Sequence, residues 1–197
     1  MEIFTLPLGD YQTNCYLVWD EEKNCAVIDP GDSPEVILQK SEENGLKIQA
    51  ILLTHGHFDH VGAVKVLAEK AGAAVWLNEK ELSLPPFLTA GSLYYTDSYE
   101  EGTCLCVGDL RFLVMETPGH TMGSVCLRCE DALFTGDTLF AGSCGRTDLG
   151  GSWAELSKSL HRLKEMDENL RVYPGHGEDS TIENERRYNP YMGRSFE

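Results

Sequence analysis

Apolar runs of strand length, separated by turn residues, divide the first part of the chain. They cover residues 2–8, 14–19 and 24–28, and the third run ends in the turn at residues 29–32, Asp-Pro-Gly-Asp. Short runs rich in Val, Ile, Leu and aromatic residues and bounded by Gly, Pro and Asp are typical of β-strands. The amino-terminal segment is therefore predicted to be β-structured.

Two stretches predicted to be helical follow. The first is predicted to begin with Ser33 as N-cap and Pro34 at the first helical position, and to end near Gly45. The second covers residues 61–71, where the apolar positions repeat with helical period, and Gly72 ends it. Two later helices are predicted from capping boxes, which lie at residues 152–155 and 180–183.

Further strands alternate with these helices. They are predicted at residues 50–53, 73–77, 105–107, 110–116, 124–128, 132–135 and 170–173. Strands cluster in both halves of the chain with helices interspersed, which favours two sheets packed together with helices outside over one doubly wound sheet. The length of 197 residues favours a single domain over residues 1–197.

Charge and composition narrow the possible functions. The formal net charge of −16 argues against nucleic acid as a partner, which would require a basic face. No basic leader and no apolar run of membrane-spanning length is visible, and the seven cysteines are an odd number. We therefore expect a cytoplasmic protein with free thiols and no membrane partner; the oligomeric state stays open. Cys126 and Cys129 are expected on opposite strand faces, not in a zinc knuckle.

The densest group of chemically active residues follows the strand at 50–53. His55, His57, Asp59 and His60 lie within six positions. Imidazole and carboxylate are ligands of zinc and related metals. Because side chains alternate in an extended turn, His55 and His57 share one side, while Asp59 and His60 fall at a helix start and can face a second centre. One loop could thus serve two metals.

Three other strand ends carry similar residues. His120 lies in a Pro-Gly turn, Asp137 follows a Thr-Gly pair, and His176 follows a second Pro-Gly. Each is weak evidence alone, since such residues are common in turns. Together they place five of the six histidines in loops after strands. The sixth, His161, is expected in a helix with a packing or surface role.

The order of these residues resembles that of the metallo-β-lactamase-fold hydrolases. The similarity includes HxHxDH at residues 55–60, the later His, Asp and His, IDPGD at 28–32 and GDTLF at 136–140. It implies an α/β fold, the αβ/βα four-layer sandwich, with a dinuclear site at one sheet edge. It also implies the ligand sets, which are His55, His57 and His120 for one metal, Asp59, His60 and His176 for the other, and Asp137 between them. Asp29 is expected to support a ligand histidine.

The resemblance also implies a mechanism. Two divalent cations about 3.5–4 Å apart would share a water and generate hydroxide, which attacks an acyl carbonyl. Zinc is the expected metal, with iron or manganese as alternatives. Asp59 and Asp137 are the carboxylates expected to act in catalysis. Cys144 has no uncommitted histidine to activate it and is not expected to be a nucleophile.

Residues 136–146 look most like glyoxalase II, which hydrolyses S-(2-hydroxyacyl)glutathione. In that family a basic residue at the place of Arg146 contacts the thiol carrier. Arg146, Cys144, Tyr94 and Tyr95 are the candidate substrate contacts, and the aromatic segment 78–103 is either a surface loop or a rim over the site. The substrate is expected to be a small acyl thioester.

Departures from that family keep alternatives open. Asp148 and Glu178 stand where it has tyrosines, and its helical carboxy-terminal domain has no counterpart after His176. These changes disfavour an anionic tripeptide, so another small thioester or ester is an alternative substrate. A second alternative is a persulfide dioxygenase with one iron, because the ligand types suit both metals. An antibiotic-hydrolysing lactamase is not expected.

Overall fold

The computed structural model describes residues 1–89 and 91–192, and it contains two six-stranded mixed sheets packed face to face. The first sheet contains, in spatial order, β1 (Glu2–Leu8), β2 (Thr13–Trp19), β3 (Asn24–Ile28), β4 (Lys47–Leu52), β5 (Ala74–Leu77) and β6 (Asp97–Ser98). The second contains β14 (Ser180–Thr181), β13 (Arg171–Pro174), β10 (Ala132–Gly136), β9 (Val125–Cys129), β8 (Leu110–Glu116) and β7 (Cys104–Val107). A short hairpin, β11 (Leu139–Phe140) and β12 (Ser143–Cys144), stands apart.

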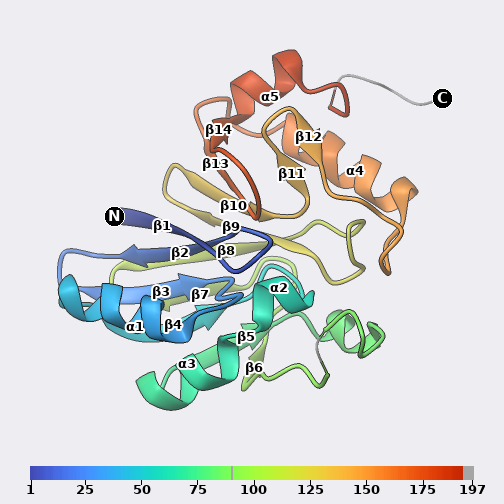
Figure 1. Ribbon diagram of the computed structural model, residues 1–197. Helices are drawn as coiled ribbons and strands as arrows, with labels where there is room; N and C mark the ends of the chain where they lie inside the picture. The colour runs from blue at the N-terminus through green and yellow to red at the C-terminus, as the bar shows by residue number, and fades with distance from the viewer. Residues whose placement is uncertain (90, 193–197) are drawn as a thin grey trace.

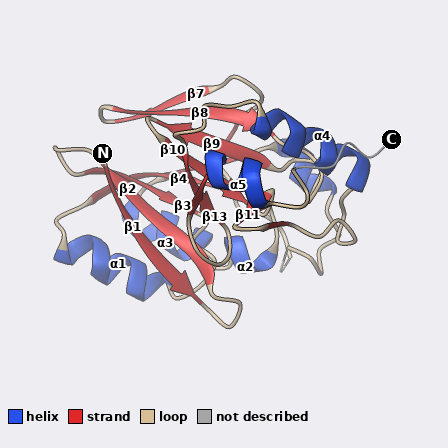
Figure 2. Ribbon diagram, turned by 90° about the horizontal axis from the view of Figure 1, so that it is seen from above, coloured by secondary structure: helices blue, strands red, loops and turns tan. Residues whose placement is uncertain are grey.

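Helices cover the outer faces of both sheets. They are α1 (Pro34–Glu43), α2 (Phe58–Val61), α3 (Val64–Ala71), α4 (Trp153–Lys164) and α5 (Ile182–Tyr188), with a 3-10 helix at Glu79–Ser83. Helices α1 and α3 lie on one side of the molecule and α4 and α5 on the other (Figure 1). Figure 2 shows α1 and α4 at opposite sides of the molecule, with most of the strands between them. The predicted two-sheet sandwich with outer helices is confirmed.

Three apolar layers hold this arrangement together. Between the sheets, Tyr16 of β2 packs against Phe134 of β10 and Tyr173 of β13, with ring centroids 5.2 and 5.6 Å away. The Tyr16 hydroxyl donates to the Pro174 carbonyl at 2.5 Å, which joins the two sheets with a polar contact. Two further clusters lie under α1 and α3 and under α4 and α5. Every residue of β2 is buried, as expected for a strand covered on both faces.

The strand directions place several loops at one edge of the sandwich. Strands β3 and β4 are parallel, and so are β10 and β13. Strand β8 runs in the direction of β10, because each is antiparallel to β9. The carboxyl ends of these five strands therefore carry the loops in which the sequence places its candidate ligands.

The helix predicted at 61–71 is two helices, α2 and α3. Ala63 donates its backbone N–H to the Pro30 carbonyl at 3.0 Å, and a Cβ at Gly62 would lie 2.3 Å from the Gly31 carbonyl oxygen. The turn after β3 thus packs against the chain between the helices and interrupts it. Because α2 begins at Phe58, Asp59 and His60 lie inside a helical turn and not before one.

The predicted caps also need correction. Ser33 has left-handed backbone conformation (φ 49°), and its hydroxyl donates to Asp32 instead of capping α1. Ser152 precedes α4 as expected but makes no side-chain capping bond. At α5 the cap is Thr181, one residue later than predicted, since its hydroxyl accepts the backbone N–H of Asn184 at 3.1 Å.

Cysteine placement agrees with the sequence. Cys126 contacts the cluster under α4 and Cys129 the cluster between the sheets, so the two thiols do point to opposite faces. All seven cysteines lie in the described ranges and are free. Among those same residues, no helix has both the length and the apolar character that crossing a membrane requires.

Candidate metal centre

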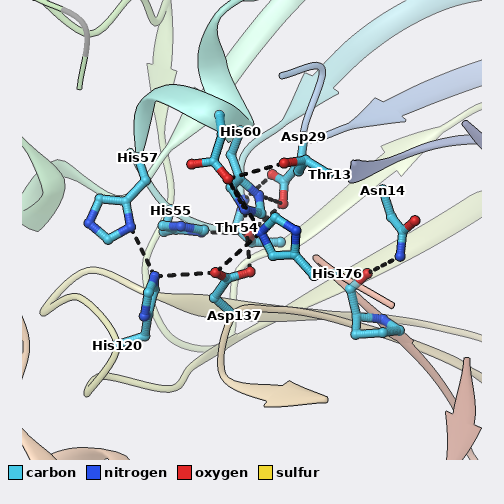
Figure 3. Close-up of polar contacts among 12 residues, drawn as sticks. Thr13, Asn14, Asp29, Thr54, His55, His57, His60, His120, Asp137 and His176 are labelled. Atoms are coloured by element: carbon cyan, nitrogen blue, oxygen red, sulfur yellow. Dashed lines mark hydrogen bonds and ion pairs between the residues drawn. The ribbon is translucent and has the colours of Figure 1, made fainter. Parts of the chain in front are cut away.

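Seven candidate ligand residues meet at the edge of the sandwich (Figure 3). The first sheet contributes four from the loop after β4 and from α2, which are His55, His57, Asp59 and His60. The second sheet contributes three from the loops after β8, β10 and β13, which are His120, Asp137 and His176. Residues separated by more than a hundred positions are thus brought into contact by the parallel strand ends.

The histidines and Asp59 form two groups that match the two expected ligand sets. One possible ligand atom from each of His55, His57 and His120 lies within 4.8 Å of the others. The same limit holds for Asp59, His60 and His176. It also holds for Asp29, His55 and His60, but both oxygens of Asp29 are already engaged, as described below.

Asp137 lies between the two groups. Its Oδ1 is 3.3 Å from His60 Nε2, and its Oδ2 is 3.5 Å from His120 Nε2 and 3.6 Å from His176 Nε2. His120 belongs to one group, whereas the other two histidines belong to the second. The carboxylate of Asp137 can therefore reach both groups at once.

The five histidines each use one ring nitrogen to contact the surrounding fold. His60 Nδ1 faces Asp29 Oδ2 at 2.9 Å, and His55 Nδ1 faces Thr54 Oγ1 at 3.1 Å. The partners of His120 Nδ1, His57 Nε2 and His176 Nδ1 are the carbonyls of Arg146, Leu149 and Tyr11 at 2.7, 3.0 and 3.2 Å. Such contacts fix ring orientation and tautomer, and they leave the other nitrogen directed inward.

Three inward atoms have no hydrogen-bond partner among the described residues although they are buried, namely His55 Nε2, His60 Nε2 and Asp137 Oδ1. His57 Nδ1 and His120 Nε2 lie only 2.9 Å apart. Buried polar groups without partners are costly and call for an explanation such as an ion. The donor set of imidazoles and carboxylates fits divalent cations such as zinc or iron.

The electrostatics of the cluster favour the neutral, metal-binding form in three of its histidines. Burial lowers the pKa of His55 and His120, and it lowers that of His57 to about 4, so these imidazoles are neutral near pH 7. Burial also disfavours the charged form of His60, but the carboxylates of Asp137 and Asp29 outweigh it and raise its pKa. Shifts in opposite directions within one cluster are typical of functional sites.

Asp29 supports this cluster from behind. Its Oδ1 accepts the backbone N–H of Thr54 at 2.8 Å, and its Oδ2 accepts the Thr54 hydroxyl at 2.6 Å in addition to facing His60. The side chain is 2% exposed. Asp29 therefore fixes both a ligand histidine and the residue that begins the ligand loop.

A cavity of about 490 Å³ opens over the cluster. Its apolar lining consists of Tyr11, Phe58, Leu88, Phe140 and Leu149. Cys144 and Arg146 also line the cavity. Tyr11 and Phe58 meet edge to face with centroids 5.2 Å apart. Burial raises the pKa of Cys144 to about 11, so its thiol is protonated near neutral pH.

Only some of the residues predicted to contact the substrate line the cavity. Arg146 lines the cavity, but both Asp148 oxygens accept bonds from its guanidinium at 2.6 Å. Tyr94 and Tyr95 pack against the cluster under α3 and are not among the described cavity residues. Segment 78–103 nevertheless contributes Leu88 to the rim. His161 is exposed on α4, away from the cluster.

Several groups that contribute to the site were not identified from the sequence. Thr13 donates its hydroxyl to Asp59 Oδ2 at 3.1 Å, and Thr54 joins Asp29 to His55. The carbonyls of Tyr11, Arg146 and Leu149 orient histidines through backbone atoms, for which side-chain identity gives no signal. The position of Thr54 directly before the histidine loop was the one available clue.

Comparison with known proteins agrees with the site. Residues 8–176 match the metallo-beta-lactamase superfamily. The hydroxyacylglutathione hydrolase GloC of Haemophilus influenzae is 37% identical, and the match covers 98% of each chain. The crystal structure of the BLEG-1 B3 metallo-beta-lactamase has a TM-score of 0.92 at 33% identity and covers 98% of this chain and 100% of its own.

A second solved structure concerns the metal. The structure of TTHA1623 in a di-iron-bound form has a TM-score of 0.85 at 38% identity and covers 95% of this chain and 99% of its own. With the fold, the edge cluster and these relatives in agreement, the chain belongs to the metallo-beta-lactamase superfamily of metallohydrolases.

Proposed function

We propose that the protein is a dinuclear metal-dependent thioesterase of the glyoxalase II type. The observation that carries this proposal is the pair of ligand groups with Asp137 between them. His55, His57 and His120 would hold one cation, Asp59, His60 and His176 the other, and Asp137 would contact both. Zinc is the first candidate; the di-iron form of TTHA1623 supports iron as an alternative.

The cations, when bound, would supply an activated water and stabilise negative charge on the substrate carbonyl oxygen. The chain contributes orientation. Asp59 faces His176 Nε2 at 3.3 Å and accepts the Thr13 hydroxyl, so its carboxylate is held at the cavity floor. Asp29 and three backbone carbonyls fix the imidazoles. Such preorganisation lowers the cost of reaching the reactive geometry.

The cavity suits a small acyl thioester. Its apolar lining would shield the reacting carbonyl from bulk water. Arg146, which also lines the cavity, is a cation that could meet a carboxylate of the thiol carrier. The name of the relative GloC supports glutathione as that carrier. The ion pair with Asp148 weakens the attraction that Arg146 can offer, so another thioester is the main alternative substrate.

The test is steady-state hydrolysis of S-D-lactoylglutathione by protein reconstituted with zinc or with iron. We expect kcat/KM above about 10⁴ M⁻¹s⁻¹. A negligible rate with both metals would contradict the glutathione substrate. Parallel assays with other acyl thioesters, with a β-lactam, and for oxygen uptake with glutathione persulfide would then identify which alternative holds.

A further inference from the structure

Glu81 is a fully buried carboxylate that the proposed function leaves without a role. It lies in the 3-10 helix Glu79–Ser83, and its exposed fraction is 0%. No ion pair joins it to a cation among the described residues. Burial raises the pKa of this carboxyl group. A buried carboxyl group destabilises a fold unless its oxygens accept hydrogen bonds.

Both oxygens contact backbone in the ligand loops. Oε2 accepts the N–H of Gly56 at 2.6 Å, and Oε1 accepts the N–H of Gly123 at 2.8 Å. Gly56 stands between His55 and His57, and Gly123 lies three residues after His120. These three histidines form one of the two ligand groups, and they come from loops of opposite sheets.

The two glycines permit this approach. A Cβ at Gly123 would lie 2.6 Å from Glu81 Oε1, and one at Gly56 would lie 3.1 Å from Oε2. Neither glycine has a positive φ, so the backbone conformation does not require glycine at either place. The carboxylate accounts for Gly123, whereas at Gly56 a Cβ would meet Leu93 Cδ1 at 3.0 Å as well as the carboxylate.

We infer that Glu81 is a positioning residue that holds the His55–His57 loop and the His120 loop in register for one metal. This inference rests on the proposed metal centre. A carboxylate is required because two N–H donors converge on it. The amide of glutamine would offer one acceptor and turn its NH₂ group toward the other backbone N–H.

The experiment compares Glu81→Gln with a matched control, Glu185→Gln. Glu185 is 1% exposed and accepts bonds from Gly142 N, Ser180 Oγ and Asn189 Nδ2 at 2.8, 2.5 and 2.7 Å. The control disturbs a similar buried network, whose contacts are with Gly142, Ser180 and Asn189 and not with the His55–His57 loop or the His120 loop. Zinc binding is measured by competition with a chromogenic chelator, and Co²⁺ absorption spectra report ligand geometry.

We expect Glu81→Gln to weaken one of two zinc equivalents by about 10-fold or more and to change the Co²⁺ spectrum. Glu185→Gln is expected to bind both equivalents like the wild type. Wild-type binding by Glu81→Gln, or an equal loss in both variants, would overturn the inference. If Glu81→Gln does not fold, Glu81→Asp takes its place with the same expectation, because the shorter side chain cannot reach both N–H groups.

The outcomes separate this inference from the proposed function. Failure of the wild-type protein to bind zinc or Co²⁺ would contradict the metal centre itself. Normal binding by the wild type together with normal binding by Glu81→Gln would contradict only the role of Glu81.

Discussion

At the scale of single residues, the orientation of each histidine ring is fixed by the contact that one of its ring nitrogens makes with the surrounding fold. Four present Nε2 to the centre, whereas His57 presents Nδ1 because its Nε2 faces the Leu149 carbonyl. The reversed ring follows from a backbone contact 92 residues away in sequence. Ligand geometry is therefore a property of the assembled fold and not of the HxHxDH segment alone.

Removing a central ligand should abolish metal content and hydrolysis together. For Asp137→Ala and His57→Ala we expect kcat/KM to fall about 100-fold or more, since each leaves the metals without a contact. Elemental analysis and thioester kinetics provide the measurement. His161→Ala, a change at an exposed histidine on α4, serves as control; full activity in either ligand variant would refute the site.

The Arg146–Asp148 ion pair should tune substrate affinity. Arg146→Ala is expected to raise KM for the glutathione thioester more than it lowers kcat, if Arg146 binds only the thiol carrier. Asp148→Asn should lower KM, because the guanidinium is then free to meet a substrate carboxylate. Exposed ion pairs are weak, so we expect the change in KM for Asp148→Asn to be small.

Lys158→Ala is the control for this pair, since Lys158 forms an exposed ion pair with Glu155 on α4. Unchanged KM in both Arg146→Ala and Asp148→Asn would remove the pair from substrate recognition.

At the scale of elements, the turn after β3 determines where α2 lies. A Cβ on Gly31 would stand 1.7 Å from the Asp59 carbonyl oxygen. The turn and the first residues of α2 are thus in direct backbone contact. Because α2 carries Asp59 and His60, a change in this turn is transmitted to two proposed ligands without touching either side chain.

Gly31→Ala should therefore weaken metal binding as well as stability. The displaced α2 moves two ligands of one group, and supporting contacts of this kind typically affect metal affinity by about 10- to 100-fold. Zinc competition and thermal unfolding are the measurements.

The control is Gly72→Ala, which has φ +67° and nothing within 4 Å of a built Cβ. It should lose about 1 kcal/mol of stability and keep its zinc affinity. Equal zinc affinity in both variants would mean that the position of α2 does not depend on this turn.

The elements also show how much of the fold and of the site could be predicted from the sequence. Apolar runs and turn residues predicted the principal strands and their helices. The loop positions of the histidines predicted a metal site, and the resemblance to the metallo-β-lactamase-fold hydrolases implied which residues form each ligand set. The break between α2 and α3 depends on the Pro30 carbonyl and Gly31, which approach from another part of the chain. Glu81 lies in the segment 78–103, for which no helix was predicted, and nothing local in the sequence reveals that two distant N–H groups point at it.

At the scale of the whole molecule, the proposed centre joins two sheets that meet through an apolar layer and a few polar contacts. Four ligands belong to the first sheet and three to the second. Val125 also donates its N–H to the Thr54 carbonyl at 2.9 Å across the same boundary. Cations at this edge would cross-link the halves of the sandwich.

Chelation should accordingly lower the thermal midpoint. Ligand present at 100 times its Kd adds about 2.7 kcal/mol to the free energy of unfolding. In a protein of this size that corresponds to roughly 5–10 °C. Differential scanning calorimetry with zinc and with a chelator measures the difference. His57→Ala should show a smaller shift, and identical midpoints for the wild type in both conditions would contradict the cross-link.

The HxHxDH segment has a consequence for the unfolded chain. Four of the seven proposed ligands lie within six residues, so a disordered polypeptide already offers a partial chelate. The remaining three are 60 to 116 positions beyond His60 and arrive only when the second sheet has formed. Zinc captured early would be held by an incomplete ligand set, and its binding to the denatured ensemble subtracts from the stabilisation gained by the native state. Refolding yield should therefore be higher when metal is added after the sandwich has closed.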